Sequence, residues 1–282
     1  MKTDLIYGVE DRPPFKDALF AALQHLLAIF VAIITPPLII ASALKLDVEK
    51  TSFLVSMSLF ASGVSTFIQC RRIGPIGAKL LCIQGTSFSF IGPIIATGLV
   101  GGLPLIFGSC IAAAPIEMVV SRTFKYLRNI ITPLVSGIVV LLIGLSLIKV
   151  GIVSCGGGYS AMDDGSFGSW ENLSIAALVL LSVLFFNRCK NKYLRMSSIV
   201  LGLCLGYGLA FALGKVDMSS LNVEMLMSFN IPQPFKYGVE FNVSSFIAIG
   251  LVYLITAIEA TGDVTANSMI SGLPIEGDSY LK

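Results

Sequence analysis

The feature that most constrains this chain is a series of apolar stretches, each about as long as a membrane is thick. At about 20 apolar residues per spanning helix, the sequence holds about eight spans. Charged residues make up only 13% of the 282 residues, whereas a soluble domain carries about 25%. The chain is therefore expected to be an all-α polytopic membrane protein, with spans near residues 17–43, 51–69, 80–99, 101–121, 130–150, 172–187, 197–213 and 244–264.

The distribution of basic residues predicts which loops face the cytoplasm. With the N-terminus inside, fourteen Lys and Arg residues fall in cytoplasmic segments and five fall in external loops. An excess of Lys and Arg is typical of cytoplasmic loops. We therefore expect a multi-pass protein of the cell membrane, in contact with the lipid bilayer, whose N-terminus is cytoplasmic. The basic residues form no stripe of the kind that binds nucleic acid, so no nucleic-acid partner is expected.

Proline and glycine are expected to interrupt two of the spans. Pro36 and Pro37 should break or bend the first span. In the third span, residues 79–85 favour a short extended stretch, and Gly92 with Pro93 should interrupt the helix again. Non-helical backbone at membrane depth is tolerated only where it is buried in protein or lines a cavity. Because broken helices near the midplane mark the substrate sites of transporters, the third span is expected to line a site.

Two carboxylates in the last span are the expected partners of the third span. Glu259 and Asp263 are four residues apart, which places them on one face of a helix. An ionisable residue inside the membrane is costly and is by default a functional-site hypothesis. A close pair of this kind can carry a proton near neutral pH, as a proton-coupled transporter requires. The alternatives are a structural Glu259 paired within the bundle and an Asp263 that reaches water near the cytoplasmic end.

Other kinds of functional site find little support in the sequence. The closest two of the six cysteines are twelve residues apart, which fits no metal or redox motif. Asp163 and Asp164 lack the alternating ligands of a calcium loop, so they are expected to form a solvated turn. Glu117 is expected to pair with Arg122. The one histidine, His25, has no nucleophile at a recognisable motif spacing, so we expect no enzyme, no metal and no cofactor other than a coupling proton.

Short motifs are distributed along almost the whole chain. They are Gln24–Phe30, Gln84–Phe88, Ile131–Gly137, Ile143–Ile148 and Glu259–Asp263, with Leu5–Tyr7, Glu10–Pro14, Ser154–Met162 and Tyr193–Arg195. The first five resemble motifs of the nucleobase–cation symporter-2 family. The other four are similar to bacterial xanthine permeases of its nucleobase–ascorbate branch.

The resemblance implies a fold of about fourteen spans, built from two inverted seven-helix repeats. One domain, the core, carries the substrate and moves against a gate domain. On that plan residues 1–16 are a cytoplasmic N-terminus, 17–121 are core-domain spans 1 to 4, 122–243 are gate-domain spans 5 to 7 with external loops, and 244–282 are span 8 with a cytoplasmic loop. The family's tenth-segment signature is absent, so the chain is expected to be the N-terminal portion of a longer permease.

The resemblance also implies substrate-binding residues. Glu259 is expected to accept the ring N–H groups of a purine, because an ionised carboxylate is a pure acceptor. Phe88 would hold the flat base by stacking, and Ser87 would tune the choice between xanthine and urate. Gln84 would support the polar network of the cavity. The alternatives are that Phe88 fills the core and that Ser87 is simply a small packing residue.

Asp263 and His25 are the residues that the resemblance assigns to a proton-linked network, with His25 near Glu259. The implied function is proton-coupled symport of a purine base, xanthine first, by a protein that forms a homodimer. A urate or uracil permease, an anion transporter of the related sulfate-permease fold, and a non-transporting fragment remain alternatives. An intramembrane enzyme would need a nucleophile and base that the sequence does not bring together.

Overall fold

The computed structural model describes residues 7–8, 10–74, 76–127, 151–191, 194–195, 197–216, 232–233 and 235–272, with a few positions between 138 and 149. Four helices in this part are long and apolar enough to cross a membrane: Val48–Arg71, Phe88–Val120, Trp170–Asn187 and Val243–Thr261. The described residues contain no β-strand beyond an isolated bridge between Ile73 and Ile76. The prediction of a helical, multi-pass membrane protein is therefore confirmed.

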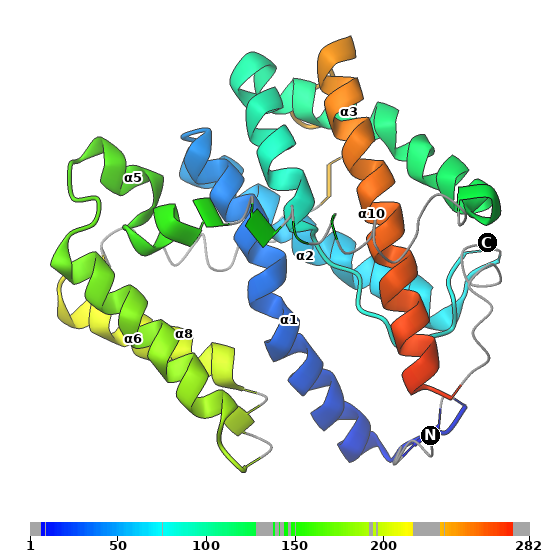
Figure 1. The fold of residues 1–282 in the computed structure, drawn as a ribbon, viewed down its shortest axis with the longest axis horizontal. Helices are drawn as coiled ribbons and strands as arrows, with labels where there is room; N and C mark the ends of the chain where they lie inside the picture. The colour runs from blue at the N-terminus through cyan, green and yellow to red at the C-terminus, as the bar shows by residue number, and fades with distance from the viewer. Residues whose placement is uncertain are drawn as a thin grey trace. The chain divides into compact units, whose positions relative to one another are not determined.

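The described elements are α1 (Phe15–Ala43), α2 (Val48–Arg71), the 3-10 turn η1 (Phe88–Phe90), α3 (Ile91–Leu127), α5 (Gly158–Asp163), α6 (Trp170–Asn187), α8 (Ser198–Ala212) and α10 (Val243–Ile270) (Figure 1). Several predictions concern residues outside the described part: most of the span at 130–150, the motif at 131–137, much of that at 143–148, residues 5, 6 and 193, and the segment 273–282.

The chain forms two compact units. Unit 1 comprises Met1–Pro13, Pro36–Ser146 and Pro232–Lys282, and unit 2 comprises Pro14–Thr35 and Leu147–Ile231. Unit 1 therefore holds α2, η1, α3 and α10, whereas unit 2 holds α5, α6 and α8.

In unit 1, α3 and α10 pack side by side (Figure 1). Both helices carry buried apolar side chains, among them Leu105 and Ala113 of α3 and Ile249 of α10. Gly250 of α10 comes so close to α3 that a Cβ there would lie 2.8 Å from Cδ1 of Ile116. Small residues of this kind let membrane helices approach closely, which compensates for the weak hydrophobic driving force in lipid.

Two glycines interrupt α3 where the sequence predicts the boundary between the third and fourth spans. Gly101 (φ −143°, ψ 17°) and Gly102 (φ 65°, ψ −160°) are not helical, and a φ of 65° is a conformation that favours glycine. The helix is therefore kinked at the expected boundary, and its division into two separate spans stays a prediction. The predicted interruption at Gly92 and Pro93 is wrong, because both residues lie in the first turn of α3. The N–H groups of a first turn have no partner within the helix, so proline, which has no N–H, fits there.

Helix α1 continues through Pro36 and Pro37, so the prolines do not break it, and the bend that was the other expectation stays a prediction. The fixed φ of proline is compatible with a helix. Membrane helices tolerate the hydrogen bond that proline cannot donate when side chains or neighbouring groups bond to the carbonyl left without a partner. Directly before the prolines, the Thr35 hydroxyl donates to the carbonyl of Val31, one turn back, at 2.7 Å. Such local side-chain bonding accompanies proline in membrane helices without ending them.

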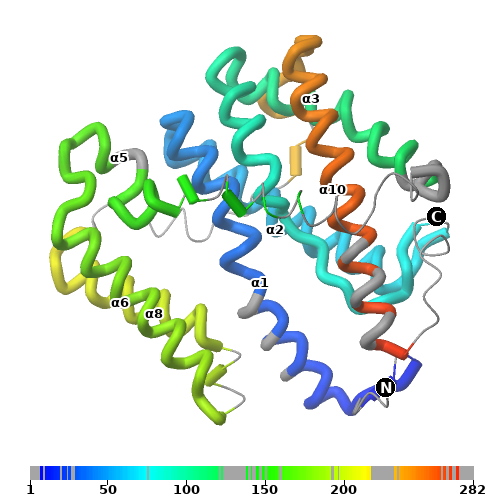
Figure 2. Tube along the Cα trace, viewed as in Figure 1, coloured from blue at the N-terminus to red at the C-terminus, as the bar shows by residue number. Residues whose placement is uncertain are grey.

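In unit 2, α6 and α8 lie side by side, as the traces in Figures 1 and 2 both show. The buried residues of α8 are Ser198, Gly202 and Gly206, spaced by four. A Cβ on Gly202 would press against Val183 of α6, and one on Gly206 would press against Val179. A stripe of small residues against two valines explains why these helices associate.

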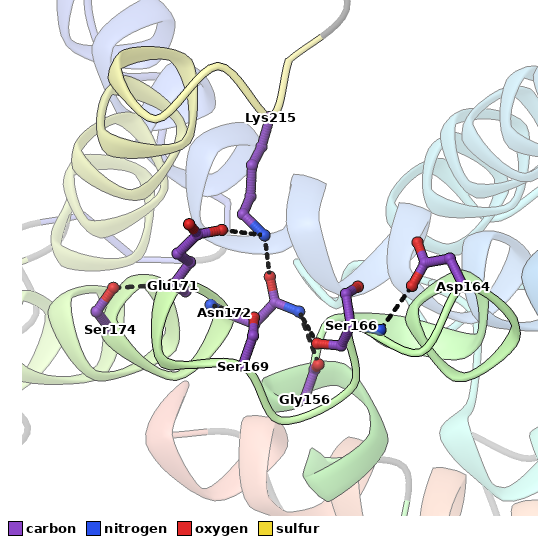
Figure 3. Close-up of polar contacts among 8 residues, drawn as sticks. All are labelled: Gly156, Asp164, Ser166, Ser169, Glu171, Asn172, Ser174 and Lys215. Carbon is purple, nitrogen blue, oxygen red and sulfur yellow. Dashed lines mark hydrogen bonds and ion pairs between the residues drawn. The ribbon is translucent and has the colours of Figure 1, made fainter.

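The start of α6 is tied to neighbouring segments by Asn172 (Figure 3). Its Nδ2 donates to the carbonyls of Gly156 at 2.9 Å and Ser166 at 3.1 Å. Its Oδ1 accepts a hydrogen bond from Nζ of Lys215 at 2.9 Å, and Lys215 also pairs with Glu171 at 2.9 Å. One side chain thus joins the loop before α6 to the segment after α8.

Asp164 begins a turn held by its own groups (Figure 3), whereas Asp163 is the last residue of α5. The N–H of Ser166 donates to Oδ1 of Asp164 at 2.8 Å. Hydrogen bonds from the Ser166 hydroxyl and N–H hold the pKa of the Asp164 carboxyl below its usual value. No group of three potential metal ligands occurs among the described residues. This geometry agrees with the turn that the sequence predicts.

Candidate functional site

A non-helical stretch in unit 1 runs from residue 79 to residue 87 and leads into η1. The N–H of Lys79 donates to the carbonyl of Gln69 at 3.0 Å. Leu80 is fully buried and clusters with Ala78 and with Val264 of α10. At the other end, Ser87 has extended backbone (φ −90°, ψ 132°). The short extended stretch predicted over 79–85 contains no helix, and non-helical backbone continues to Ser87, but Lys79 with a φ of 57° is not extended.

Side chains from two helices satisfy backbone groups of this stretch. The N–H of Gln84 donates to Oγ1 of Thr66 at 2.9 Å, and the Ser62 hydroxyl donates to the Gln84 carbonyl. From α10, Nδ2 of Asn267 donates to the carbonyl of Leu81 at 2.7 Å. Backbone groups without water at membrane depth need such partners. Helices α2 and α10 therefore hold the stretch in place from two sides.

The stretch brings two hydroxyl groups to the carboxylate of Glu259. Oγ of Ser87 lies 3.3 Å from Oε2, and Oγ of Ser89 lies 3.0 Å from Oε1. Both hydroxyls donate, because an ionised carboxylate only accepts. Glu259 is half-buried, and each of its oxygens keeps further acceptor capacity. The arrangement can receive an N–H donor from a ligand.

Ser89 is a residue that the sequence analysis missed. A signal was available in the run Thr86–Phe90, where serine recurs at every second position. In the structure Ser87 has extended backbone and Ser89 lies in η1, and both hydroxyls reach Glu259. Of this run, the sequence predicts only Ser87 and Phe88 at the site.

Among the aromatic residues of the site, Phe90 contacts α10. Its ring meets that of Tyr253 edge to face, with centroids 4.9 Å apart and planes at 71°. The Tyr253 hydroxyl in turn donates to the carbonyl of Cys110 at 3.4 Å. Phe88 is half-buried one residue after Ser87, at the start of η1. Its stacking on a ligand stays a prediction.

Gln84 lies in the non-helical stretch, and its side chain bonds to the backbone of that same stretch. Nε2 of Gln84 donates to the carbonyl of Cys82 at 3.5 Å. The groups of Gln84 that hold the site together are those of its backbone, through Ser62 and Thr66. A direct role of the Gln84 side chain in binding stays a prediction.

Neither of the other two predicted site residues takes part in the contacts among Ser87, Ser89 and Glu259. Asp263 is on α10 one turn after Glu259, is exposed, and acts electrostatically on Cys82. His25 is exposed on α1 and belongs to unit 2, whereas Glu259 belongs to unit 1. The expected proximity of His25 to Glu259 stays a prediction.

The predicted pairing of Glu117 with Arg122 is wrong. Both residues are described and form no ion pair with each other, whereas ion pairs of the described part include Asp47–Lys50, Glu171–Lys215 and Glu49–Lys236. At 3.6 residues per turn, a separation of five residues places two side chains about 140° apart around the helix. Glu117 is instead half-buried within electrostatic reach of Tyr253.

Comparison with known proteins gives one matching family model. It is described as "Permease family", and it matches residues 16–282. The match therefore includes both the non-helical stretch and α10.

Several curated proteins are similar to this chain over nearly its whole length. Xanthine permease XanQ of Escherichia coli (strain K12) is 47% identical over 287 residues, which cover 99% of this chain and 61% of that protein. Xanthine permease XanP of the same strain is 46% identical over 291 residues, covering 99% and 62%. Uric acid permease PucJ of Bacillus subtilis (strain 168) is 34% identical over 264 residues, covering 93% and 58%. The chain thus spans about three fifths of the length of these relatives.

Proposed function

This chain belongs to the nucleobase–cation symporter-2 family of permeases, and from that membership we propose that the protein is a proton-coupled symporter of a purine base. Xanthine is the proposed substrate, because the relatives that are 46–47% identical carry the name xanthine permease. The observation that carries the proposal is the Glu259 carboxylate held by two serine hydroxyls beside a non-helical stretch.

The chemistry of this carboxylate suits a purine-dione. Such a base is flat and uncharged, and its ring N–H groups are donors, so it is best recognised by an acceptor-only group. Glu259 supplies that acceptor, and the proposed role of Phe88 is to stack on the face of the ring. In this scheme Ser87 contributes to the choice among purines, and Gln84 supports the polar surroundings.

Protonation within the group formed by Glu259, Asp263 and His25 is the proposed coupling step. The spacing of Glu259 and Asp263 on α10 supports this scheme, because neighbouring carboxylates can share a proton. In the cycle, a proton and the base bind together, the core domain moves against the gate domain, and both are released to the cytoplasm.

The proposed architecture is a bacterial inner-membrane protein with a cytoplasmic N-terminus, two inverted repeats and a dimeric assembly. The chain would supply the first repeat and the first span of the second. Residues 17–121 and the span at 244–264 would belong to the core domain, with 122–243 in the gate domain. The packing of α3 against α10 within unit 1 supports grouping the fourth and eighth spans together.

Uptake of labelled xanthine tests the proposed function. The protein would be expressed at its full natural length in cells that lack their own purine uptake. We expect saturable uptake that falls when a protonophore abolishes the proton gradient, at equal amounts of protein in the membrane. Uptake indistinguishable from that of cells with an empty vector would contradict the proposal, and uptake insensitive to the protonophore would contradict proton coupling alone.

Urate is the second candidate substrate. The observation that favours it is the 34% identity to the uric acid permease of Bacillus subtilis. A competition experiment with unlabelled xanthine, urate and uracil distinguishes the candidates. We expect xanthine to compete best, and stronger competition by urate or uracil would transfer the assignment to that base.

A further inference from the structure

We propose that Ser89 is a positioning residue of the substrate site, whose hydroxyl fixes the orientation of the Glu259 carboxylate. The inference rests on the proposed function of the same site. Ser89 Oγ donates to Oε1 at 3.0 Å, and Ser87 Oγ donates to Oε2 at 3.3 Å. Because each carboxylate oxygen is held by a different hydroxyl, the carboxylate cannot turn about its last bond without losing a hydrogen bond.

The two serines do not have the same role. The oxygen of Ser87 also accepts the N–H of Ser89 at 3.3 Å, and this contact caps η1. Ser87 therefore serves both the local backbone and the carboxylate. The hydroxyl of Ser89 makes the shorter contact with Glu259 and does not cap the turn. A change of Ser89 to alanine consequently removes the carboxylate contact and leaves the cap in place.

The backbone around Ser89 is held by contacts that do not involve its hydroxyl. The ring of Phe90 packs against Tyr253 of α10, with centroids 4.9 Å apart. The N–H of Phe90 donates to the carbonyl of Ser87 at 3.4 Å. Further back, Gln84 is docked on α2. Removal of the Ser89 hydroxyl should therefore leave η1 in position and act mainly on Glu259.

The chemistry explains why a fixed carboxylate matters for binding. An ionised carboxylate offers about four lone-pair positions, and the two serine hydroxyls occupy one on each oxygen. The remaining position on each oxygen is then held in a defined direction for an N–H donor of the base. A group that is already oriented loses less freedom when the ligand binds. Without Ser89, the base itself has to orient Oε1, so it binds more weakly.

Kinetics of xanthine uptake by the full-length protein test this role. The variants are Ser89→Ala, Ser89→Cys and Ser89→Thr, each compared at equal amount in the membrane. Loss of one hydrogen bond to a charged group predicts a KM about tenfold higher for the alanine and cysteine variants. The maximal rate per transporter should change much less. Threonine keeps the hydroxyl and should restore a KM near that of the wild type.

Ser58→Ala is the matched control. The Ser58 hydroxyl donates to the carbonyl of Val55 within α2 at 2.8 Å, so its loss also removes one serine hydrogen bond from a membrane helix. The KM of the Ser58→Ala variant for xanthine should be that of the wild type. Cysteine at position 89 has nearly the size of serine but is a weak donor, so it replaces alanine if the alanine variant does not reach the membrane.

Two results would overturn the inference while the proposed function stands. One is a wild-type KM in both Ser89→Ala and Ser89→Cys. The other is a threonine variant as impaired as the alanine variant, which would show that the hydroxyl itself is not what matters. Absence of xanthine uptake by the wild-type protein would instead overturn the proposed function, and the inference with it.

Discussion

The hydroxyl oxygen of Ser89 lies 3.0 Å from Oε1 of Glu259, although 170 positions separate the two residues in the chain. The contact joins a 3-10 turn that follows non-helical backbone to the middle of a long helix. Polar side chains in the membrane are costly unless they are paired, and here each partner satisfies the other. The relationship exists only once α2, α3 and α10 have brought the two segments together.

Replacement of Glu259 by glutamine should reduce xanthine uptake by about 100-fold or more, because charge-assisted hydrogen bonds are lost at both carboxylate positions. Glutamine keeps one acceptor oxygen, but its NH2 group donates and cannot accept the hydroxyl of Ser87 or Ser89. Glu117→Gln, a change at the other acid that is half-buried among the described residues, serves as the control and should retain uptake. Unimpaired uptake by the Glu259 variant would remove Glu259 from the site.

Thr66→Val should loosen the non-helical stretch, because it leaves the N–H of Gln84 without its partner. A buried backbone group left unpaired costs about 1–3 kcal/mol, so the unfolding temperature in detergent should fall. Cys82, two residues before Gln84, should also react faster with a thiol reagent, with the exposed Cys204 as internal reference. Thr66→Ser keeps the hydroxyl and should match the wild type. Equal Cys82 reactivity in the valine variant and the wild type would contradict the role of Thr66.

The helices could be predicted well from the sequence because the bilayer dictates their length and polarity. The expected spans at 172–187 and 197–213 correspond to α6 and α8 within two residues at each end. The prolines were harder to interpret, since the effect of proline depends on its position in the helix. Pro93 lies in the first turn of α3 and Pro36 inside α1, and neither ends its helix.

The candidate site could be predicted only in part. An acid in a membrane span is rare and costly, so Glu259 could be identified from its place within an apolar stretch of the sequence. The contact of Ser89 with Glu259 depends on tertiary packing between segments far apart in the chain, which local patterns do not encode. The pairing of Glu117 with Arg122 failed for a different reason, because proximity in sequence was taken for proximity on the helix surface.

Gly108→Ala should destabilise unit 1, because a Cβ at this position of α3 would collide with the backbone of Glu240. The same approach is secured by the N–H of Glu240, which donates to the carbonyl of Pro104 at 3.0 Å. Overpacking of this kind costs about 1–3 kcal/mol, which a thermal unfolding curve would detect. Gly63→Ala in α2 is the control, since nothing lies within 4 Å of a Cβ there. If both variants unfold at the same temperature, the close approach of Gly108 to the backbone of Glu240 does not contribute to stability.

Gly206→Leu should separate α6 from α8, because the new side chain would occupy the space of Val179. The same helix offers a matched control in Gly208, where a Cβ would meet nothing within 4 Å. Small residues at a helix contact are needed for close packing in the membrane, so only the change at 206 should lower the unfolding temperature. Equal loss in the two variants would mean that leucine disturbs α8 itself, independently of its contact with α6.

Asp47 should make the stability of α2 depend on pH. A hydrogen bond from the Lys50 side chain, and then one from its N–H, holds the pKa of the Asp47 carboxyl below its ordinary 3.8. A lowered pKa in the folded state stabilises the fold above the unfolded-state pKa, and this contribution disappears as the pH falls through the lowered value.

In Asp47→Asn the amide still caps the helix but does not titrate. The wild-type protein should therefore unfold at a higher temperature than this variant near pH 6, and the difference should shrink below about pH 4. A difference of the same size at both pH values would show that the charge of Asp47 contributes nothing to the start of α2. Comparing the two proteins at each pH is necessary, because the other carboxylates of the chain titrate in the same range and their effects cancel in the difference.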